Sequence, residues 1–517
     1  MKKNTLINPK LLLLVFAGIQ FIHFPLQAQS RDLSPENISR ALQEASVKVR
    51  RDSLRPAFHL SPPAGFMGDP NGGIYYDGWY HIFYLLQPFS SSPGPWYWAH
   101  ARSLDLLSWE HMEDGLTPAF ELGLSGVGSG STIISESGKP MAFYSERVDG
   151  PMEFWQARFN NDLTGWEHPP SNPVLTLEHP GLPEFDDFWR DPFVFSVEGR
   201  TFLIACADLF EENYVPVPVF ESKNAELTTW EYKGILFSYP KHKSRNLEVP
   251  ELRPLGEKWI LLASTDAPND RCVFFIGDLD LENLKFIPDS EGILDYSSHY
   301  YAQETIMDDS GNLYLMAWMP GWDRNWLPKY MNEPRKNNSP VLNGCFAIPR
   351  RLSFDEKGRL IQQPVDIMKQ LRTDHFTIGG KKLPVHGPLT AYDVVDGIRG
   401  DQLEIDIEME LNNASFCGLN VLCDKTGKGG LFIVWSGDVV NVDGVAVPIE
   451  EWKYGDQLQL QIFIDKQLVE VFIKGGRYCV SRKVRLENIK GDYIALTTLG
   501  GTANLISLEG WKLKTID

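Results

Sequence analysis

The sequence has few cysteines and no arrangement that suggests a metal site. Six are spread over 517 residues, none forms a CxxC pair, and no histidine stands at metal-ligand spacing from them. A cysteine-based zinc site is therefore not indicated, and we expect no metal and no cofactor. We expect isolated buried thiols. A disulfide between two of Cys417, Cys423 and Cys479 is the alternative in an oxidising compartment.

Basic residues are also in short supply. Asp and Glu number 68 against 49 Lys and Arg, which gives a formal net charge of -19. Such an acidic chain argues against partners that are nucleic acids or anionic membranes. The charge does not identify a partner and does not indicate an oligomeric state.

Long apolar runs are absent beyond the N-terminus. Lys2, Lys3 and Lys10 precede an apolar stretch over residues 11–24, which is short for a membrane span. We interpret residues 1–28 as a signal peptide and expect an exported, periplasmic or extracellular protein with no membrane span after its removal. An uncleaved anchor is the alternative.

Aromatic residues are abundant. They make up 12% of the chain and include 15 Trp, which favours β-structure and stacking surfaces. Hydrophobic residues make up 43%, and the length allows two or three domains. A hairpin pattern recurs, in which two aromatic-rich runs flank a turn of Gly, Asp or Glu, as in GIYYDGWYHIFY.

Two motifs recur along the first two thirds of the chain. SLDLLSWEH, NNDLTGWEH and NAELTTWEY end near Trp109, Trp166 and Trp230, and GDLDLENLKF is a weaker copy. A second set of short polar motifs leads into the hairpins in step with the first. These leads are GDPNG at Asp69, GSGS at Ser129, RDP at Asp191, EVPE at Glu248 and QET at Glu304. Five units of about 60 residues predict a β-propeller.

Propeller geometry predicts that the leads meet. The innermost strand of every blade lines the central channel, so equivalent positions of successive blades converge on one axis. We therefore expect Asp69, Asp191, Glu248 and Glu304 to approach one another. The alternative is that these acids cap turns on the outer surface, as acidic residues commonly do.

The whole chain is predicted to be all-β, with a five-bladed β-propeller followed by a C-terminal β-sandwich. After the signal peptide, residues 29–57 form a helical segment that begins at Ser34-Pro35-Glu36. Residues 58–350 form the propeller and 351–385 a connector. Residues 386–517 show strand after strand without helical periodicity, which is typical of a sandwich.

These motifs resemble those of glycoside hydrolase family 32, the invertase, levanase and inulinase family. GDPNG resembles NDPNG, GSGS resembles FSGS, RDP is identical, EVPEL resembles ECPDL, and DKQLVEVFIKGGR resembles a segment of the family's C-terminal sandwich. The similarity extends over about residues 58 to 515. It implies a five-bladed propeller joined to a sandwich, and an enzyme that cleaves β-fructofuranosidic bonds in fructans, fructo-oligosaccharides or sucrose-type sugars.

The resemblance also implies roles for individual residues. Asp69 would be the nucleophile, Glu248 the general acid and then base, and Asp191 a transition-state stabiliser held by Arg190. Such a carboxylate pair cleaves glycosidic bonds with retention when the two groups lie about 5 to 5.5 Å apart. The further residues that we expect to bind the sugar are Arg190, Trp98, Ser129, Glu304 and Asn71.

The departures from the family pattern surround the predicted pocket. Gly68 replaces Asn, Leu85 replaces Gln, Gly128 replaces Phe, and Glu304 replaces Gln. We interpret Gly68 and Gly128 as opening space. The alternatives are a related propeller glycosidase acting on other furanosides or pentosides, a non-catalytic sugar-binding protein on the same scaffold, and fructosyl transfer in place of hydrolysis.

Overall fold

The structure is a computed structural model. It describes residues 33–90, 94–119, 124, 126–147, 151–209, 212–266, 270–320, 342–383, 393–453 and 455–516. The predicted signal peptide lies outside these residues. No helix among the described residues has both the length and the apolar character to cross a membrane.

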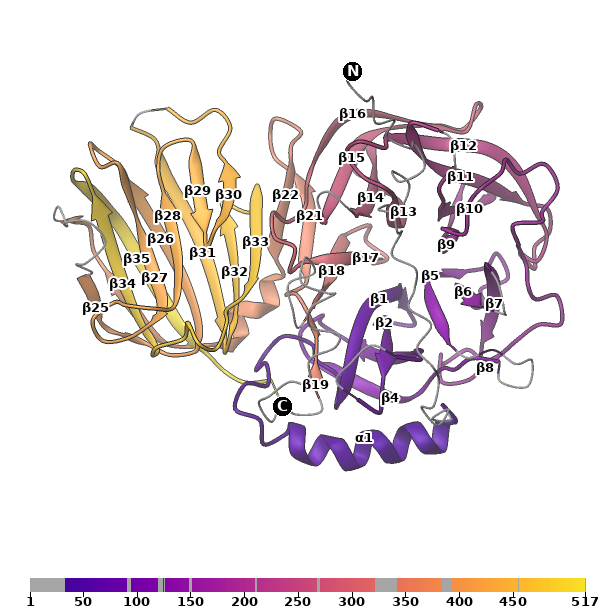
Figure 1. Cartoon of the computed structure of the whole chain (residues 1–517), viewed down its shortest axis with the longest axis horizontal. Helices are drawn as coiled ribbons and strands as arrows, with labels where there is room; N and C mark the ends of the chain where they lie inside the picture. The colour runs from indigo at the N-terminus through magenta and orange to yellow at the C-terminus, as the bar shows by residue number, and fades with distance from the viewer. Residues whose placement is uncertain are drawn as a thin grey trace, which may run out of the picture.

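Five sheets surround a common axis in the right-hand body of Figure 1. The first contains β1 (Gly65–Tyr76), β2 (Trp79–Gln87), β3 (Tyr97–Ser103), β4 (Trp109–Leu116) and β19 (Leu342–Asn343). The second contains β5 (Val127–Ile134), β6 (Pro140–Arg147), β7 (Met152–Phe159) and β8 (Trp166–Glu167). The third contains β9 (Arg190–Val197), β10 (Arg200–Cys206), β11 (Tyr214–Ser222) and β12 (Trp230–Pro240).

The remaining two sheets complete the ring. The fourth contains β13 (Leu247–Leu255), β14 (Lys258–Thr265), β15 (Arg271–Asp280) and β16 (Lys285–Ile293). The fifth contains β17 (Tyr301–Met307), β18 (Leu313–Met319), β20 (Cys345–Phe346), β21 (Arg350–Phe354) and β22 (Leu360–Pro364). The innermost strands β1, β5, β9, β13 and β17 contact one another in this order, and β17 contacts β1 again. The described residues thus form the predicted β-propeller, here called blades one to five.

Tight turns explain why the aromatic runs pair as hairpins. Asp77 and Gly78 join β1 to β2 with φ of 49° and 82°, and Glu198 and Gly199 join β9 to β10 with φ of 51° and 72°. Two consecutive left-handed residues form the turn whose twist matches antiparallel strands. The ring is closed by β19, which pairs in parallel with Gly65 and Phe66 of β1.

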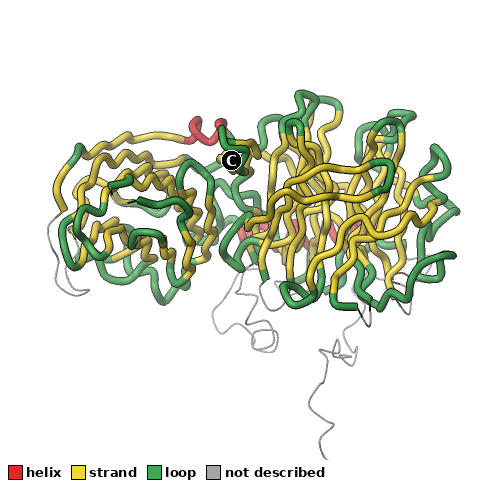
Figure 2. The backbone as a smooth tube through the Cα atoms, turned by 90° about the horizontal axis from the view of Figure 1, so that it is seen from above, coloured by secondary structure: helices red, strands yellow, loops and turns green. Residues whose placement is uncertain are grey.

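The segment 351–385 differs from the predicted connector. Strands β21 and β22 pair with blade five, so the propeller continues to Pro364. A short 3-10 helix, η3 (Asp366–Leu371), lies at the junction of the two bodies (Figure 2). The next strand, β23 (Arg372–Ile378), already pairs with the last strand of the chain. Its alternation of polar and apolar residues is weak, and the pairing is set by a partner far away in sequence.

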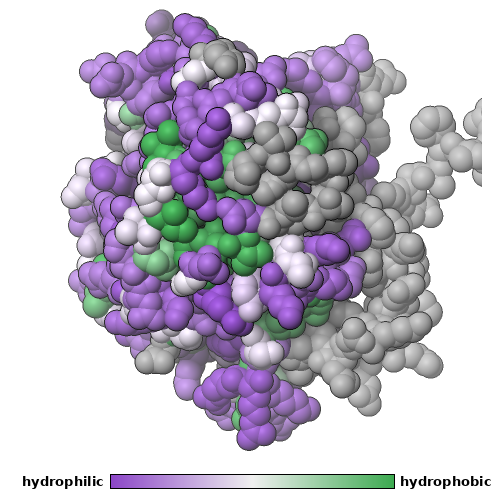
Figure 3. Space-filling view, turned by 90° about the vertical axis from the view of Figure 1, so that its left-hand side faces the viewer, coloured by the Kyte–Doolittle hydropathy of each residue, from purple (hydrophilic) through white to green (hydrophobic). Residues whose placement is uncertain are grey.

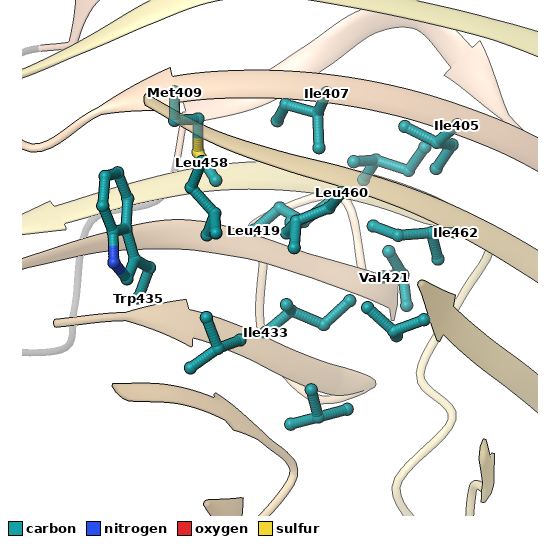
Figure 4. Close-up of a cluster of buried hydrophobic side chains, with 14 of the residues drawn as sticks. Ile405, Ile407, Met409, Leu419, Val421, Ile433, Trp435, Leu458, Leu460 and Ile462 are labelled. Carbon is teal, nitrogen blue, oxygen red and sulfur yellow. The ribbon is translucent and has the colours of Figure 1, made fainter. Parts of the chain in front are cut away.

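The C-terminal body is a sandwich of two sheets. One contains β23, β24 (Lys381–Leu383), β26 (Gln402–Glu410), β31 (Gln457–Asp465), β32 (Leu468–Ile473), β33 (Tyr478–Lys483) and β35 (Ala503–Leu513). The other contains β25 (Asp393–Arg399), β27 (Phe416–Cys423), β28 (Leu431–Trp435), β29 (Val439–Val442), β30 (Val445–Pro448) and β34 (Tyr493–Leu499). Ile405, Ile407, Leu419 and Ile433 meet between the sheets (Figure 4). The outer end of the sandwich is mostly hydrophilic around a central hydrophobic area (Figure 3).

The predicted N-terminal helix is present. Helix α1 (Pro35–Val49) begins at the predicted position and runs along one edge of the propeller (Figure 1). Leu33 and Ile38 pack in one cluster with Phe66 and Ile82 of blade one, so burial of this apolar stripe holds the helix in place. All six cysteines are buried and free, which confirms the expectation of isolated thiols.

A network of buried charges joins the two bodies. Arg350 of blade five donates to Asp295 Oδ2 at 3.0 Å and to Glu470 Oε2 of the sandwich at 2.7 Å. His59 lies between Asp465 and Glu470, with ring nitrogens 2.7 and 3.0 Å from their carboxylates. These two pairings raise the pKa of His59 to about 9, although burial opposes the shift. The imidazole is therefore charged at neutral pH and balances part of the buried negative charge.

Candidate active site

A β-bulge interrupts every innermost strand near its start. The pairing shifts after Met67 in β1, after Val127 in β5, after Arg190 in β9, after Glu248 in β13 and after Tyr301 in β17. A bulge bends its strand and redirects the adjacent side chains. Five equivalent bulges therefore direct residues of all five blades toward one end of the central channel.

Three of the bulges begin with a left-handed residue. Asp191, Val249 and Ala302 have φ of 58°, 45° and 48°, a conformation that costs a residue with a side chain about 1–3 kcal/mol. In each case the backbone N–H of the left-handed residue donates a hydrogen bond to a side chain of the preceding blade. Ser145 Oγ accepts from Asp191 at 2.9 Å, Asp191 Oδ2 accepts from Val249 at 3.0 Å, and Ser264 Oγ accepts from Ala302 at 3.0 Å. These bonds offset the strain and fix neighbouring blades to one another.

Asp69 lies within the bulge of blade one, between Met67 and Pro70, and its carboxylate contacts blade two. Its Oδ2 accepts a hydrogen bond of 2.8 Å from the Ser129 hydroxyl. The backbone carbonyl of Ser129 accepts in turn from Ser145 Oγ at 3.2 Å, and the same Oγ binds the Asp191 amide. A short chain of hydrogen bonds thus connects Asp69 to Asp191, although the two residues are far apart in sequence.

Asp191 is 6% exposed and lies among charged groups. Burial raises its pKa to about 7, and the negative charges of Glu248 and Asp69 contribute in the same direction. The Arg190 guanidinium, with Nε 3.6 Å from Asp191 Oδ2, opposes the shift. The mutual influence of these carboxylates on the pKa of Asp191 places the three predicted acids in one electrostatic site.

Glu248 is held between residues of the two neighbouring blades. Arg190 of β9 pairs with its Oε1, and the Tyr301 hydroxyl of β17 donates to its Oε2 at 2.6 Å. Arg190, Glu248 and Tyr301 all occupy the position immediately before a bulge. Tyr301 was not predicted from the sequence, but counting from the bulge in YAQET and EVPE would have identified it as the equivalent of Glu248.

Glu304 lies near Asp191, as the repeat predicted, but it is not the equivalent of Glu248. It follows the bulge of β17, as Glu251 follows that of β13, so its equivalent is Glu251 and not Glu248. Its Oε1 accepts from the Gly73 amide at 2.6 Å, and its side chain is 4% exposed. Glu304 and Glu251 line a narrow cavity together with Asp191. Burial, then the neighbouring Glu251 carboxylate, raises the pKa of Glu304 well above its usual range. The structure therefore places Glu304 beneath the site, and not at the position that was predicted to contact the sugar.

Three other predicted sugar contacts support the site from behind. Trp98 is fully buried and its indole N–H donates to the carbonyl of Gly128 at 2.9 Å. Asn71 is also fully buried, and it binds the carbonyl of Asp69 at 2.8 Å and the amide of Gly130 at 3.0 Å. Ser129 is 6% exposed and directs its hydroxyl to Asp69. These side chains orient the acids, because their polar atoms are already bound within the protein.

The glycines that replace larger family residues do not simply open space. A β-carbon on Gly128 would stand 3.0 Å from that of Ser145, which is tighter than ordinary packing. At Gly68 it would stand 3.2 Å from Leu85 and 3.7 Å from the ring of Trp96. The space beside Gly68 is thus bounded by the apolar side chains of Leu85 and Trp96. The interpretation that Gly128 opens space is wrong, because Ser145 already occupies the position next to it.

Metal-binding geometry is not found in the part of the chain that the structure describes. No group of three or more His, Cys, Asp or Glu side chains is arranged to hold an ion there. The site is instead a set of carboxylates with one guanidinium, two serine hydroxyls and one tyrosine hydroxyl. These groups can donate and accept protons, attack an electrophilic carbon and stabilise positive charge.

Comparison with known families covers both bodies of the molecule. Residues 59–364 match the profile described as the glycosyl hydrolases family 32 N-terminal domain. Residues 368–512 match that of the glycosyl hydrolases family 32 C terminal. The two ranges meet at η3, where the structure divides propeller from sandwich.

Individual relatives are distant but extend over most of the chain. The raffinose invertase of Escherichia coli is 27% identical over 470 residues, covering 86% of this chain and 92% of the relative. The levanase of Bacillus subtilis is 28% identical over 480 residues, covering 83% of this chain and 66% of the relative.

Solved structures share the fold. Fructan 1-exohydrolase IIa from Cichorium intybus has a TM-score of 0.74 at 20% identity, covering 90% of this chain and 98% of that one. Sucrose-6-phosphate hydrolase from Lactobacillus gasseri has a TM-score of 0.73 at 20% identity, covering 94% of this chain and all of that one. The chain belongs to family 32 of the glycosyl hydrolases.

Proposed function

We propose that the protein hydrolyses β-fructofuranosidic bonds in fructans or fructo-oligosaccharides by a retaining, double-displacement mechanism. One observation carries the proposal. Asp69, Asp191 and Glu248 lie within or directly before the equivalent bulges of three blades. Membership of family 32 and relatives named invertase and levanase give the substrate class. A site that only bound sugar would not need a nucleophile and a proton donor together.

The three acids take different roles in this mechanism. Asp69 attacks the anomeric carbon, while Glu248 protonates the leaving oxygen and then activates the water that releases the sugar. Ser129 orients the attacking carboxylate through its hydrogen bond of 2.8 Å. Arg190 and Tyr301 contact both oxygens of Glu248 and hold it in one orientation. Asp191 faces the ring hydroxyls and stabilises the positive charge that develops on the sugar.

The proposal is tested with purified protein on levan, inulin, sucrose and fructo-oligosaccharides. Product analysis separates hydrolysis from fructosyl transfer, and exo from endo cleavage. We expect free fructose or short fructans from wild type, and almost none from Glu248→Gln. Absence of products from the whole panel, with Glu248→Gln equal to wild type, would overturn the proposal. Turnover of an aryl arabinoside alone would instead support a pentosidase.

Export is part of the proposal, on the basis of the positive start and the apolar run over residues 11–24. Cell fractionation of the full-length chain tests it. Activity in the culture medium or periplasm, with a mature N-terminus near residue 29, is the expected result. Activity confined to the cytoplasm, with Met1 retained, would contradict export.

A further inference from the structure

A second hollow lies at the outer part of blade one, away from the carboxylates. It has a volume of about 300 Å³ and is lined by Trp79, Arg102, Leu104, Asp105, Trp109 and Glu110, among others. Asp69 is near the start of β1 and Trp79 follows its end, so the strand places the two roughly 20 Å apart. We call these six residues the blade-one hollow.

Strand register brings three side chains of the blade-one hollow, those of Trp79, Arg102 and Glu110, to one face. His81 pairs with Arg102 across β2 and β3, and Arg102 pairs with Glu110 across β3 and β4. Trp79 lies two residues before His81 in β2, so its side chain shares that face. Strand pairing thus sets the positions of these three side chains, whereas Leu104 and Asp105 belong to the loop between β3 and β4.

Arg102 is the centre of the blade-one hollow. Its guanidinium lies 4.4 Å from the centroid of the Trp79 ring, and its Nε donates to Glu110 at 2.8 Å. The two side chains are 26% and 56% exposed, so a ligand from solvent can reach this ion pair. A fixed donor beside a fixed acceptor suits neighbouring sugar hydroxyls, each of which both donates and accepts.

The loop between β3 and β4 is rigid. Ser103 Oγ accepts from the Leu106 amide at 2.8 Å, and Asp105 Oδ1 accepts from Leu107 at 2.9 Å and Ser108 at 2.8 Å. This loop holds the Leu104 side chain 63% exposed beside two partly exposed indoles. The apolar surface is thus presented to water by a preorganised loop, which suits the apolar C–H face of a sugar ring.

Blade one differs here from a blade with the same repeat. Trp230 of blade three occupies the position equivalent to Trp109 but is 3% exposed and packs in a core cluster. The repeat position therefore serves only the scaffold in blade three, whereas in blade one it also lines the hollow. A hollow of about 300 Å³ is in the range of sites for small ligands. Its size and its mixture of aromatic and charged groups fit one or two sugar units.

We propose that the blade-one hollow is a second glycan-binding site, which holds part of a fructan polymer while another part of a chain reaches the carboxylates. This inference rests on the proposed function for its choice of glycan. Two linked binding events raise the apparent affinity for a polymer without changing the affinity for a short substrate. Loss of the second site should therefore weaken binding of polymers and leave binding of short substrates unchanged.

The test uses Trp79→Ala, Arg102→Ala and Leu104→Ser in the full chain. Binding to levan and inulin is measured by affinity gel electrophoresis, with Glu248→Gln added to prevent degradation. We expect about tenfold weaker polymer binding, a higher KM on polymer, and unchanged kcat/KM on a trisaccharide. Arg200→Ala is the matched control, because Arg200 of blade three also pairs with a glutamate, at 2.8 Å, and stacks on Phe202.

Leu104→Ser removes an exposed side chain, so it tests the hollow even if Trp79→Ala fails to fold. Wild-type polymer binding by a folded Leu104→Ser or Trp79→Ala protein would overturn the inference. So would an equal loss of activity on polymer and on trisaccharide. Failure of wild type to cleave any fructan would count against the proposed function, whereas polymer binding that depends on Trp79 would still support the second site.

Discussion

At the scale of single residues, the acids differ because their surroundings differ. Asp69 accepts from a hydroxyl, Asp191 is desolvated beside Arg190, and Glu248 is held between Arg190 and Tyr301. Side chains of similar chemistry can therefore take different parts in one reaction. Three predictions follow from these contacts.

Removal of either reacting carboxylate should abolish turnover and leave the fold intact. We expect Glu248→Gln and Asp69→Asn to lower kcat by about a thousandfold, since an amide neither transfers the proton nor attacks. Steady-state kinetics on the preferred fructan check this, with Asp187→Asn, an exposed acid near RDP, as the control. Loss of less than about tenfold in either variant would contradict the assigned role.

Loss of the Tyr301 hydroxyl should weaken catalysis more than binding. A hydrogen bond to a charged group contributes about 1.5–3 kcal/mol, so Tyr301→Phe should reduce kcat at least about tenfold with little change in KM. Tyr80→Phe removes a hydroxyl that contacts Asp308 at 3.4 Å in the outer part of blade one, and should behave as wild type. Equal kinetics for the two variants would show that Tyr301 does not position Glu248.

Glu304 should make the fold more sensitive to rising pH. Its pKa is raised in the folded chain, so above its ordinary value near 4.5 the unfolded chain loses a proton that the folded chain keeps. Stability contributed by protonated Glu304 is thus complete at low pH and declines as pH rises. Glu304→Gln should raise Tm at pH 8 more than at pH 4, and exposed Glu257→Gln should not. An equal shift at both pH values would contradict the buried-acid account.

At the scale of elements, the feature that recurs in every blade is the bulge near the start of the innermost strand. The sequence predicted the number of repeats and the hairpins, because turn pairs such as Asp77-Gly78 are local signals. It could not predict which lead residues were equivalent, since a bulge shifts the register without a clear signature in the surrounding residues. Glu304 was therefore aligned with Glu248, and Tyr301 was missed. In 351–385, β23 and β24 are defined by pairing with the distant β35, whereas β21 and β22 form a local hairpin.

The buried charges between the two bodies form a second element-scale feature. Arg350→Met leaves Asp295 without its cation and Glu470 with His59 as its remaining cation, and an unpaired buried charge costs about 3–5 kcal/mol. We expect a clearly lower denaturant midpoint for this variant. Arg351→Met, at the exposed next position, is the matched control. An unchanged midpoint for Arg350→Met would show that the network does not hold the bodies together.

At the scale of the whole molecule, a closed ring of blades converts sequence distance into proximity. Asp69 and Glu248 are remote along the chain but adjoin one axis, as the repeat and the family resemblance together predicted. The immediate environment of the acids was less predictable. Trp98 and Asn71 are buried supports, and Leu85 and Trp96 bound the space beside Gly68, because tertiary contacts decide exposure.

The central claim is that Asp69 and Glu248 cleave a fructoside through a covalent intermediate. The most direct measurement is peptide mass spectrometry of Glu248→Gln after brief exposure to a fructofuranoside with a good leaving group. Without its general base, this variant should accumulate a fructosyl adduct on the peptide that contains Asp69, and Asp69→Asn should show none. A Glu248→Gln protein that cleaves the substrate without an adduct, or carries the adduct on another residue, would contradict the claim.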